Sequence, residues 1–223
     1  MKEPKHREVR IPVTETGLTG DLCMPEGANG LVVFAHGSGS SRKSPRNLLV
    51  ASNLCLSGFG TLLFDLLTEE EDRVYDNRFD IPLLATRLEE AVVWAKRDVL
   101  DQGVSIGLFG ASTGAAAALI AASRLDGAIE AVVSRGGRPD LAREALAKVA
   151  CPTLLIVGSL DSDVIALNRK AMAQMPGGTE VSLEIVPKAT HLFPEPGALE
   201  EVSRLAQAWF EAHLPKTAPS SQP

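Results

Sequence analysis

The chain has 223 residues and a formal net charge of −6, with 45% hydrophobic and 22% charged residues. These fractions are close to globular averages and exclude disorder over most of the length, and a chain of this size is expected to form one α/β domain. Only 4% of the residues are aromatic, so the core must be built mainly from Ala, Leu, Val and Ile.

Charge and hydropathy exclude several partners. A pI near 5.3, without any basic cluster interleaved with aromatics, argues against nucleic-acid binding. The longest apolar run, at 115–122, is too short to span a membrane, and the charged start MKEPKHREVR lacks the apolar core of a secretory signal. We expect a cytoplasmic protein with neither a membrane nor a nucleic-acid partner. Whether it is a monomer or a homodimer stays open.

The three cysteines are Cys23, Cys55 and Cys151. They show no CxxC spacing, and their odd number leaves at least one unpaired. Buried free thiols in a reducing compartment are therefore expected, in preference to a disulfide or a zinc site.

Extended and helical patterns alternate along the chain. Two short strands come first, joined by a hairpin turn at Glu15-Thr16-Gly17, and continuous apolar runs alternate with helical periodicity from residue 30 onward. This pattern predicts a doubly wound, mostly parallel α/β sheet with an N-terminal antiparallel hairpin, in a single domain over 1–214. The Pro- and Ser-rich segment 215–223 is predicted to be disordered. The expected strands are 7–13, 18–24, 31–35, 61–64, 104–109, 129–133, 153–157 and 181–186, and the expected helices are 46–57, 81–97, 114–124, 140–149, 165–174 and 197–213.

The strongest local motif is Gly110-Ala111-Ser112-Thr113-Gly114, between the apolar strand VSIGLF and the helix AAAALIAA. This is the strand–turn–helix setting in which G-x-S-x-G forms a nucleophile elbow, and the helix N-terminus behind it favours an oxyanion. The plainer alternative is an ordinary strand-to-helix turn. We predict that Ser112 is a nucleophile.

A serine nucleophile needs a histidine base at the same sheet edge. The histidines are His6, His36, His191 and His213, and only His191 lies in a loop after the last expected strand and before the last helix. His191 is therefore the predicted base, against the alternative of a loop histidine without a role.

The acid is expected after another strand, between the serine and the histidine in chain order. Asp161, which follows TLLIVG, is preferred to Asp163, which is expected to cap the next helix instead.

Two backbone N–H groups are predicted to form the oxyanion hole, those of Thr113 and of Ser38 in the small-residue segment after the first buried strand. A competing interpretation takes Gly37-Ser38-Gly39 as the start of a dinucleotide fingerprint with Asp65 as the ribose-binding acid. The third glycine is absent, because Arg42 occupies its position, and a partial fingerprint is weak.

Five segments of the chain are VVFAHGSGSSRKSPRN, GLFGASTGAAAA, SRGGRPDLA, LLIVGSLDSDV and PKATHLFPEPGALEEV. Together they resemble the α/β-hydrolases, and more narrowly their dienelactone hydrolase-like branch. The resemblance implies an esterase fold with a nucleophile–acid–histidine triad at Ser112, Asp161 and His191. The chain departs from this family in one respect: dienelactone hydrolases use a cysteine nucleophile, whereas the elbow here carries a serine. Cys151, the nearest cysteine in sequence, precedes a strand instead of lying on an elbow. A serine carboxylesterase fits better than dienelactone hydrolysis itself.

Two features bear on the substrate. Arg135 and Arg138 follow a strand at the same edge and are candidate contacts for a substrate carboxylate or phosphate, unless they pair with the acidic residues 69–72 or with Asp140. The polar segment 68–80 is too short and charged for a lipase-type cap, so no cap domain is expected.

The sequence as a whole predicts hydrolysis of small or short-chain carboxylic esters through an acyl-enzyme, without a metal or an organic cofactor. Two alternatives remain: a thioesterase or other acyl hydrolase with the same triad, and a non-catalytic hydrolase-fold binding protein.

Overall fold

An eight-stranded sheet forms the centre of the molecule. The structure is a computed structural model that describes residues 4–13, 15, 17–101 and 103–214. The strand order is β1-β2-β4-β3-β5-β6-β7-β8. β1 and β2 form an antiparallel hairpin, β2 runs antiparallel to β4, and all other neighbours are parallel. The strands are β1 Lys5–Ile11, β2 Leu18–Met24, β3 Leu31–Ala35, β4 Gly60–Phe64, β5 Ile106–Ala111, β6 Ala131–Arg135, β7 Thr153–Gly158 and β8 Val181–Val186.

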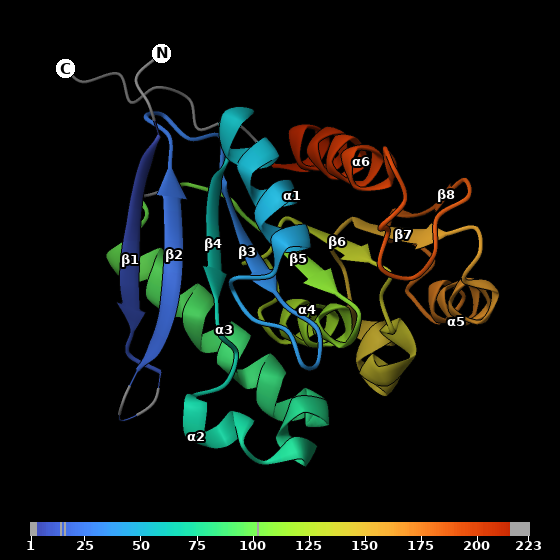
Figure 1. Cartoon of the computed structure of the whole chain (residues 1–223), viewed down its shortest axis with the longest axis horizontal. Helices are drawn as coiled ribbons and strands as arrows, with labels where there is room; N and C mark the ends of the chain where they lie inside the picture. The colour runs from blue at the N-terminus through green and yellow to red at the C-terminus, as the bar shows by residue number, and fades with distance from the viewer. Residues whose placement is uncertain (1–3, 14, 16, 102, 215–223) are drawn as a thin grey trace.

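Helices cover both faces of the sheet, so the predicted mixed α/β architecture is confirmed (Figure 1). Helices α1 and α6 pack against one face, while α3, α4 and α5 pack against the other with η2. No separate cap lies over the sheet within the described ranges. The helices are α1 Pro45–Leu56, α2 Glu69–Asp72, α3 Ile81–Asp98, α4 Thr113–Arg124, α5 Ser162–Met172 and α6 Ala198–His213, and the 3₁₀ segments are η1 Tyr75–Phe79 and η2 Pro139–Lys148.

Helix α4 explains part of the low aromatic content. Each residue from 113 to 122 is buried, and the run contains four consecutive alanines at 115–118. A Cβ added at Gly114 would meet the backbone carbonyls of Ala35 and His36, so small side chains let this helix approach the sheet closely. On the other face Phe34 and Phe109 stack with ring centroids 4.8 Å apart. Most of the buried aromatic rings belong to the cluster on this face, opposite α4.

Several predicted boundaries differ from the structure by two or three residues, as for the strands expected at 104–109 and 129–133 and the helix expected at 165–174. Two further differences have a clear physical reason. The first strand ends at Ile11 instead of residue 13, because Pro12 has no N–H to donate to the sheet and Val13 turns back to bond the Ile11 carbonyl at 2.9 Å. The helix expected at 140–149 is instead the 3₁₀ segment η2, interrupted at Arg143, whose backbone has φ 49° and ψ −125°. A left-handed φ at a non-glycine residue breaks helical hydrogen bonding.

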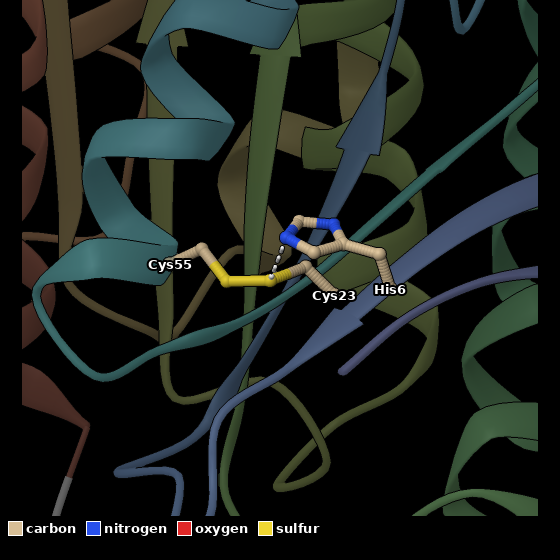
Figure 2. A group of neighbouring side chains, drawn as sticks. All are labelled: His6, Cys23 and Cys55. Carbon is tan, nitrogen blue, oxygen red and sulfur yellow. Dashed lines mark hydrogen bonds between the residues drawn. A yellow bond between two sulfur atoms is a disulfide. The ribbon is translucent and has the colours of Figure 1, made fainter. Parts of the chain in front are cut away.

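The expectation of three free thiols is wrong for two of the cysteines. Cys23 in β2 and Cys55 in the last turn of α1 form a disulfide, with Cα atoms 6.5 Å apart (Figure 2). β2 lies beside β4 in the sheet and α1 packs over that face, which brings together two residues separated by 32 positions. Cys151 is a free thiol, and burial raises its pKa to about 11.

The polar segment 68–80 is more ordered than a loop. Thr68 caps α2 through a reciprocal pair of bonds with Glu71, and η1 follows directly. Figure 1 shows α2 beyond the end of β4. The segment predicted to be disordered, 215–223, lies outside the described residues. Among the described helices, none combines the length and the apolar character that crossing a bilayer requires.

Candidate active site

Ser112 occupies a sharp turn between β5 and α4. Its backbone has φ 51° and ψ −119°, a left-handed conformation that L-residues adopt only under strain. A Cβ at Gly110 would meet the backbone of Ala115, and one at Gly114 would meet the end of β3, so both flanking positions require glycine. The N–H of Ser112 donates to the carbonyl of Arg135 at 3.2 Å, which fixes the turn to β6. The motif thus has the geometry of a nucleophile elbow.

The structure brings Ser112 together with His191 and Asp161. The Nε2 atom of His191 lies 3.4 Å from Ser112 Oγ, and its Nδ1 atom lies 2.6 Å from Asp161 Oδ2. With the ring proton assigned to Nδ1, that nitrogen donates to the carboxylate and Nε2 is free to accept from the serine hydroxyl. The three side chains therefore form one hydrogen-bonded row.

Close contact between two loops positions the histidine and the acid. Asp161 follows β7 and His191 follows β8, its parallel neighbour. The Leu160 N–H donates to the Ala189 carbonyl at 2.9 Å, and a Cβ at Gly158 would collide with the backbone of Ala189. Glycine at the end of β7 thus lets the two loops approach each other.

Asp163 does not take part in this row. It is the second residue of α5, whose N-cap position is Asp161, so the expected capping by Asp163 is not seen. An acid in the first turn still interacts favourably with the positive end of the helix dipole.

The two residues predicted to form the oxyanion hole lie beside each other. The Ser38 N–H donates to Thr113 Oγ1 at 2.8 Å. Thr113 is the first residue of α4, where backbone N–H groups have no intrahelical acceptor. Both N–H groups are thus at the elbow, with that of Ser38 bound to a hydroxyl.

His36 fixes the segment that carries Ser38. Its Nε2 accepts from the Leu66 N–H at 3.1 Å, and Nδ1 lies 3.0 Å from the Gly37 carbonyl. Burial holds the pKa of the imidazole below its usual 6.5, and the hydrogen bond to Gly37 opposes this only in part. His36 is therefore a neutral link between the ends of β3 and β4. The sequence shows its position at the end of a buried strand but not this contact.

The two arginines lie in different surroundings. Arg138 pairs with Asp140 through bonds of 2.9 and 2.8 Å, as one of the predicted alternatives has it. Arg135 is 6% exposed and donates to Asn47 Oδ1 at 3.2 Å, and neither arginine bonds the acidic residues 69–72 within the described chain. Burial, and secondly the charge of Arg46, lower the Arg135 pKa to about 10.

A cavity of about 870 Å³ opens beside Thr113. It lies between α3, α4 and η2, and its walls combine apolar side chains with four cationic and two acidic ones. Arg143, the residue with the left-handed backbone in η2, is part of this wall. The cavity can accept a substrate group next to the elbow. Its lining includes Phe79, Ile81, Ile120, Arg138, Leu141 and Arg143.

Comparison with known proteins decides the family. The family model described as "Alpha/beta hydrolase domain" matches residues 28–209. The chain is an α/β-hydrolase. A solved dienelactone hydrolase from Anabaena variabilis ATCC 29413 is 51% identical, with a TM-score of 0.91 over 96% of this chain and 100% of that one. This places the hydrolase in the dienelactone hydrolase-like branch.

The other similar proteins say less about the family and the function. Est1E from Butyrivibrio proteoclasticus superposes with a TM-score of 0.77 over 92% of this chain and 98% of its own, but at 18% identity it shows the fold alone. Two curated proteins of Mycobacterium tuberculosis, each named "Putative phosphoribosyl transferase", are 51% identical over 97% of this chain. The hydrolase spans only 48% of their length, so the name describes proteins about twice as long.

Proposed function

We propose that this α/β-hydrolase is a serine carboxylesterase acting on small or short-chain esters through an acyl-enzyme. The observation that supports it is the row Asp161–His191–Ser112, with contacts of 2.6 and 3.4 Å, at a strained elbow. A base within hydrogen-bond reach of a serine, itself oriented by a carboxylate, activates that serine as a nucleophile.

The reaction starts at His191. Its Nε2 accepts the hydroxyl proton as Ser112 Oγ attacks the ester carbonyl, and Asp161 stabilises the resulting imidazolium. The oxyanion is bound by the N–H groups of Thr113 and Ser38, the latter exchanging the Thr113 hydroxyl for the substrate oxygen. His191 then protonates the leaving alcohol and activates the water that hydrolyses the acyl-enzyme. None of these steps needs a metal or an organic cofactor.

The surroundings of the elbow favour small substrates. No cap covers it within the described chain, and the adjoining cavity of about 870 Å³ is open to solvent. Arg138 lines this cavity and remains a proposed contact for an anionic substrate group. Arg135 is not proposed as a substrate contact, because its guanidinium donates to Asn47. The hydrolase therefore offers short esters a site that needs no interfacial opening.

The test is a panel of p-nitrophenyl esters of increasing chain length. Ser112→Ala should lower turnover at least about a thousandfold without changing the melting temperature. The matched control Ser57→Ala, which removes a hydroxyl bonded to the Asn53 carbonyl at the end of α1, should keep wild-type activity. Wild-type turnover by Ser112→Ala would overturn the assignment.

Two further measurements separate the alternatives. A fluorophosphonate probe should label wild type and not Ser112→Ala, whereas failure to label wild type supports the non-catalytic binding protein. Matched thioesters hydrolysed faster than oxygen esters would identify a thioesterase with the same triad.

A further inference from the structure

A second group of reactive side chains lies away from the elbow. His6, Cys23 and Cys55 bring one imidazole nitrogen and two sulfur atoms within 4.8 Å of one another (Figure 2). Cys23 is paired with Thr61 near the start of β4, whereas the elbow lies beyond the opposite, carboxyl ends of the parallel strands. Nothing in the proposed ester hydrolysis uses these three residues.

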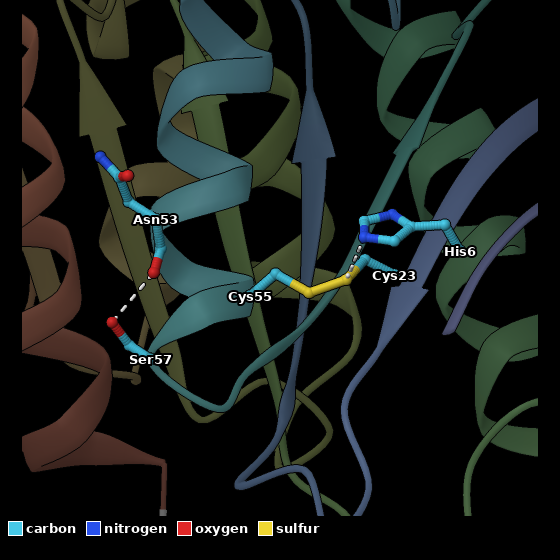
Figure 3. Close-up of a disulfide and its surroundings, with 5 residues drawn as sticks. All are labelled: His6, Cys23, Asn53, Cys55 and Ser57. Carbon is cyan, nitrogen blue, oxygen red and sulfur yellow. Dashed lines mark hydrogen bonds between the residues drawn. A yellow bond between two sulfur atoms is a disulfide. The ribbon is translucent and has the colours of Figure 1, made fainter. Parts of the chain in front are cut away.

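The backbone holds the three residues in fixed positions. His6 and Cys23 are direct partners in the β1–β2 ladder, and β2 is bonded on its other side to β4. Cys55 lies in the last turn of α1, and the C-cap residue of this helix is Ser57. The Ser57 hydroxyl donates to the Asn53 carbonyl at 2.9 Å (Figure 3). Two strands and a helix thus direct their side chains to one point.

The imidazole of the exposed His6 directs one nitrogen at sulfur. Its Nε2 atom lies 3.6 Å from Cys23 Sγ. Two donors bound to one tetrahedral zinc ion, with bonds of about 2.1 and 2.3 Å, are themselves about 3.5 Å apart. The His6–Cys23 pair already has this spacing. Two thiolates bound to one tetrahedral zinc ion lie about 3.8 Å apart, so the two sulfurs reach that spacing when the disulfide opens and they move apart by about 1.7 Å.

We propose that His6, Cys23 and Cys55 form a redox-controlled zinc site, which binds the ion in the dithiol form and releases it when the disulfide forms. Thiolate and imidazole donors select zinc or another soft cation, not magnesium or calcium. Binding releases one proton from each thiol and uses the neutral imidazole nitrogen.

The redox step balances with a peroxide as oxidant. Two thiolates, one hydrogen peroxide molecule and two protons give one disulfide and two water molecules, and the two electrons lost by sulfur reduce the O–O bond. The zinc ion leaves because its two sulfur ligands are now joined to each other. A dithiol reductant reverses the step by exchange, with its own two sulfurs ending as the disulfide.

The surroundings provide access and an open fourth position. A cavity of about 390 Å³ is lined by all three residues together with Glu8 and Asp21. Both cysteines are at most 5% exposed, while His6 lies at the surface. The carboxylates are already paired, Asp21 with Arg42 and Lys43 at 3.1 and 2.7 Å and Glu8 with Arg42 at 3.2 Å. Water is left as the fourth ligand.

The test uses the full chain, freed of metal, in the presence or absence of a non-thiol reductant. Zinc binding is measured by competition with a chromogenic chelator. The reduced wild type should bind one ion per chain, and peroxide should release that ion as the two thiols disappear. The matched control Cys151→Ser should behave like wild type, since Cys151 is the free thiol.

Variants identify the ligands. Cys55→Ser should abolish zinc binding and His6→Ala should weaken it by an order of magnitude or more. Cobalt added to reduced wild type gives a thiolate charge-transfer band and the visible bands of tetrahedral coordination, a readout that does not depend on any variant folding. The proposal fails if reduced wild type binds no more zinc than Cys23→Ser/Cys55→Ser does. It also fails if the cobalt spectrum lacks the thiolate band, or if His6→Ala binds zinc as tightly as wild type.

Discussion

Asp161 Oδ2 lies 2.6 Å from His191 Nδ1, while the carboxylate of Asp163, two positions along, has no contact with the histidine. A charge-assisted hydrogen bond of this length fixes the ring tautomer, so that Nε2 faces Ser112 as an acceptor. The side chain of Asp161 is 17% exposed, which strengthens its interaction with the imidazolium formed during the proposed reaction.

Asp161→Asn should therefore lower ester turnover by about three to four orders of magnitude, because the amide stabilises the wrong tautomer. Asp163→Asn is the matched control, since it removes the same charge from the same loop, and it should remain close to wild type. Turnover of both variants on a short p-nitrophenyl ester decides the matter. Equal losses of turnover in the two variants would show that Asp161 is not the acid of the triad.

These site residues were predictable because each depends on local sequence. Ser112 is identified by a motif whose glycines allow a tight turn, and Asp161 and His191 by their places after apolar strands. In a parallel sheet the ends of such strands meet at one edge, so chain order alone brings the residues near one another. The distances depend on the loop contact at Ala189, which the sequence does not show.

The half-buried His36 predicts that the protein loses stability at acid pH. Its pKa is below 6.5 in the folded state, so between that pKa and 6.5 the unfolded chain binds more protons than the folded one. Its contribution is complete above about pH 6.5 and is lost as the pH falls below that value.

Urea unfolding from about pH 8 down to about pH 5 checks this expectation. His36→Leu should cost about 1–3 kcal/mol at the upper end, because the Leu66 N–H loses its acceptor. Its unfolding free energy should also fall less steeply with decreasing pH than that of wild type. Parallel curves would show that His36 does not titrate in this range.

Gly114 should tolerate no side chain. A methyl group there meets the carbonyls of Ala35 and His36, so Gly114→Ala must move α4 away from the end of β3, at a cost of about 3 kcal/mol or more. Gly177→Ala is the matched control, because nothing lies within 4 Å of its added Cβ. Thermal unfolding should leave Gly177→Ala near wild type. A small effect of Gly114→Ala would mean that the elbow can relax.

The parts that sequence reasoning missed depend on long-range packing. Cys23 and Cys55 meet only because β2 joins the sheet beside β4 and α1 packs over that position. The spacing of the cysteines in the sequence does not predict this arrangement of strands and helix. Arg135 looked like a substrate contact because it follows a strand at the reactive edge. Val133 packs with α1 and α6, and strand alternation directs Arg135 to that same face. A shared edge does not determine which way a side chain points.

Arg135 makes a final prediction about stability. Its Nε and one terminal nitrogen are buried without a hydrogen-bond partner among the described residues, and its charge faces that of Arg46. Replacing a buried charge with an apolar side chain of similar size is commonly neutral or stabilising. Arg135→Met should therefore raise the unfolding free energy by about 1–3 kcal/mol at neutral pH. Arg138→Met, which breaks a half-exposed ion pair, should lower it by about 1 kcal/mol or less.

The pH dependence of the Arg135→Met effect tests its cause. Below about pH 10 both the folded and unfolded wild type carry the Arg135 proton, so the gain from substitution is constant. Above that pH the folded wild type loses the proton while the unfolded chain keeps it, which stabilises wild type and shrinks the gain. Denaturant unfolding of both proteins from neutral pH to above that pKa measures the difference directly. A loss of several kcal/mol in Arg135→Met would instead show that the buried guanidinium is compensated in the folded protein.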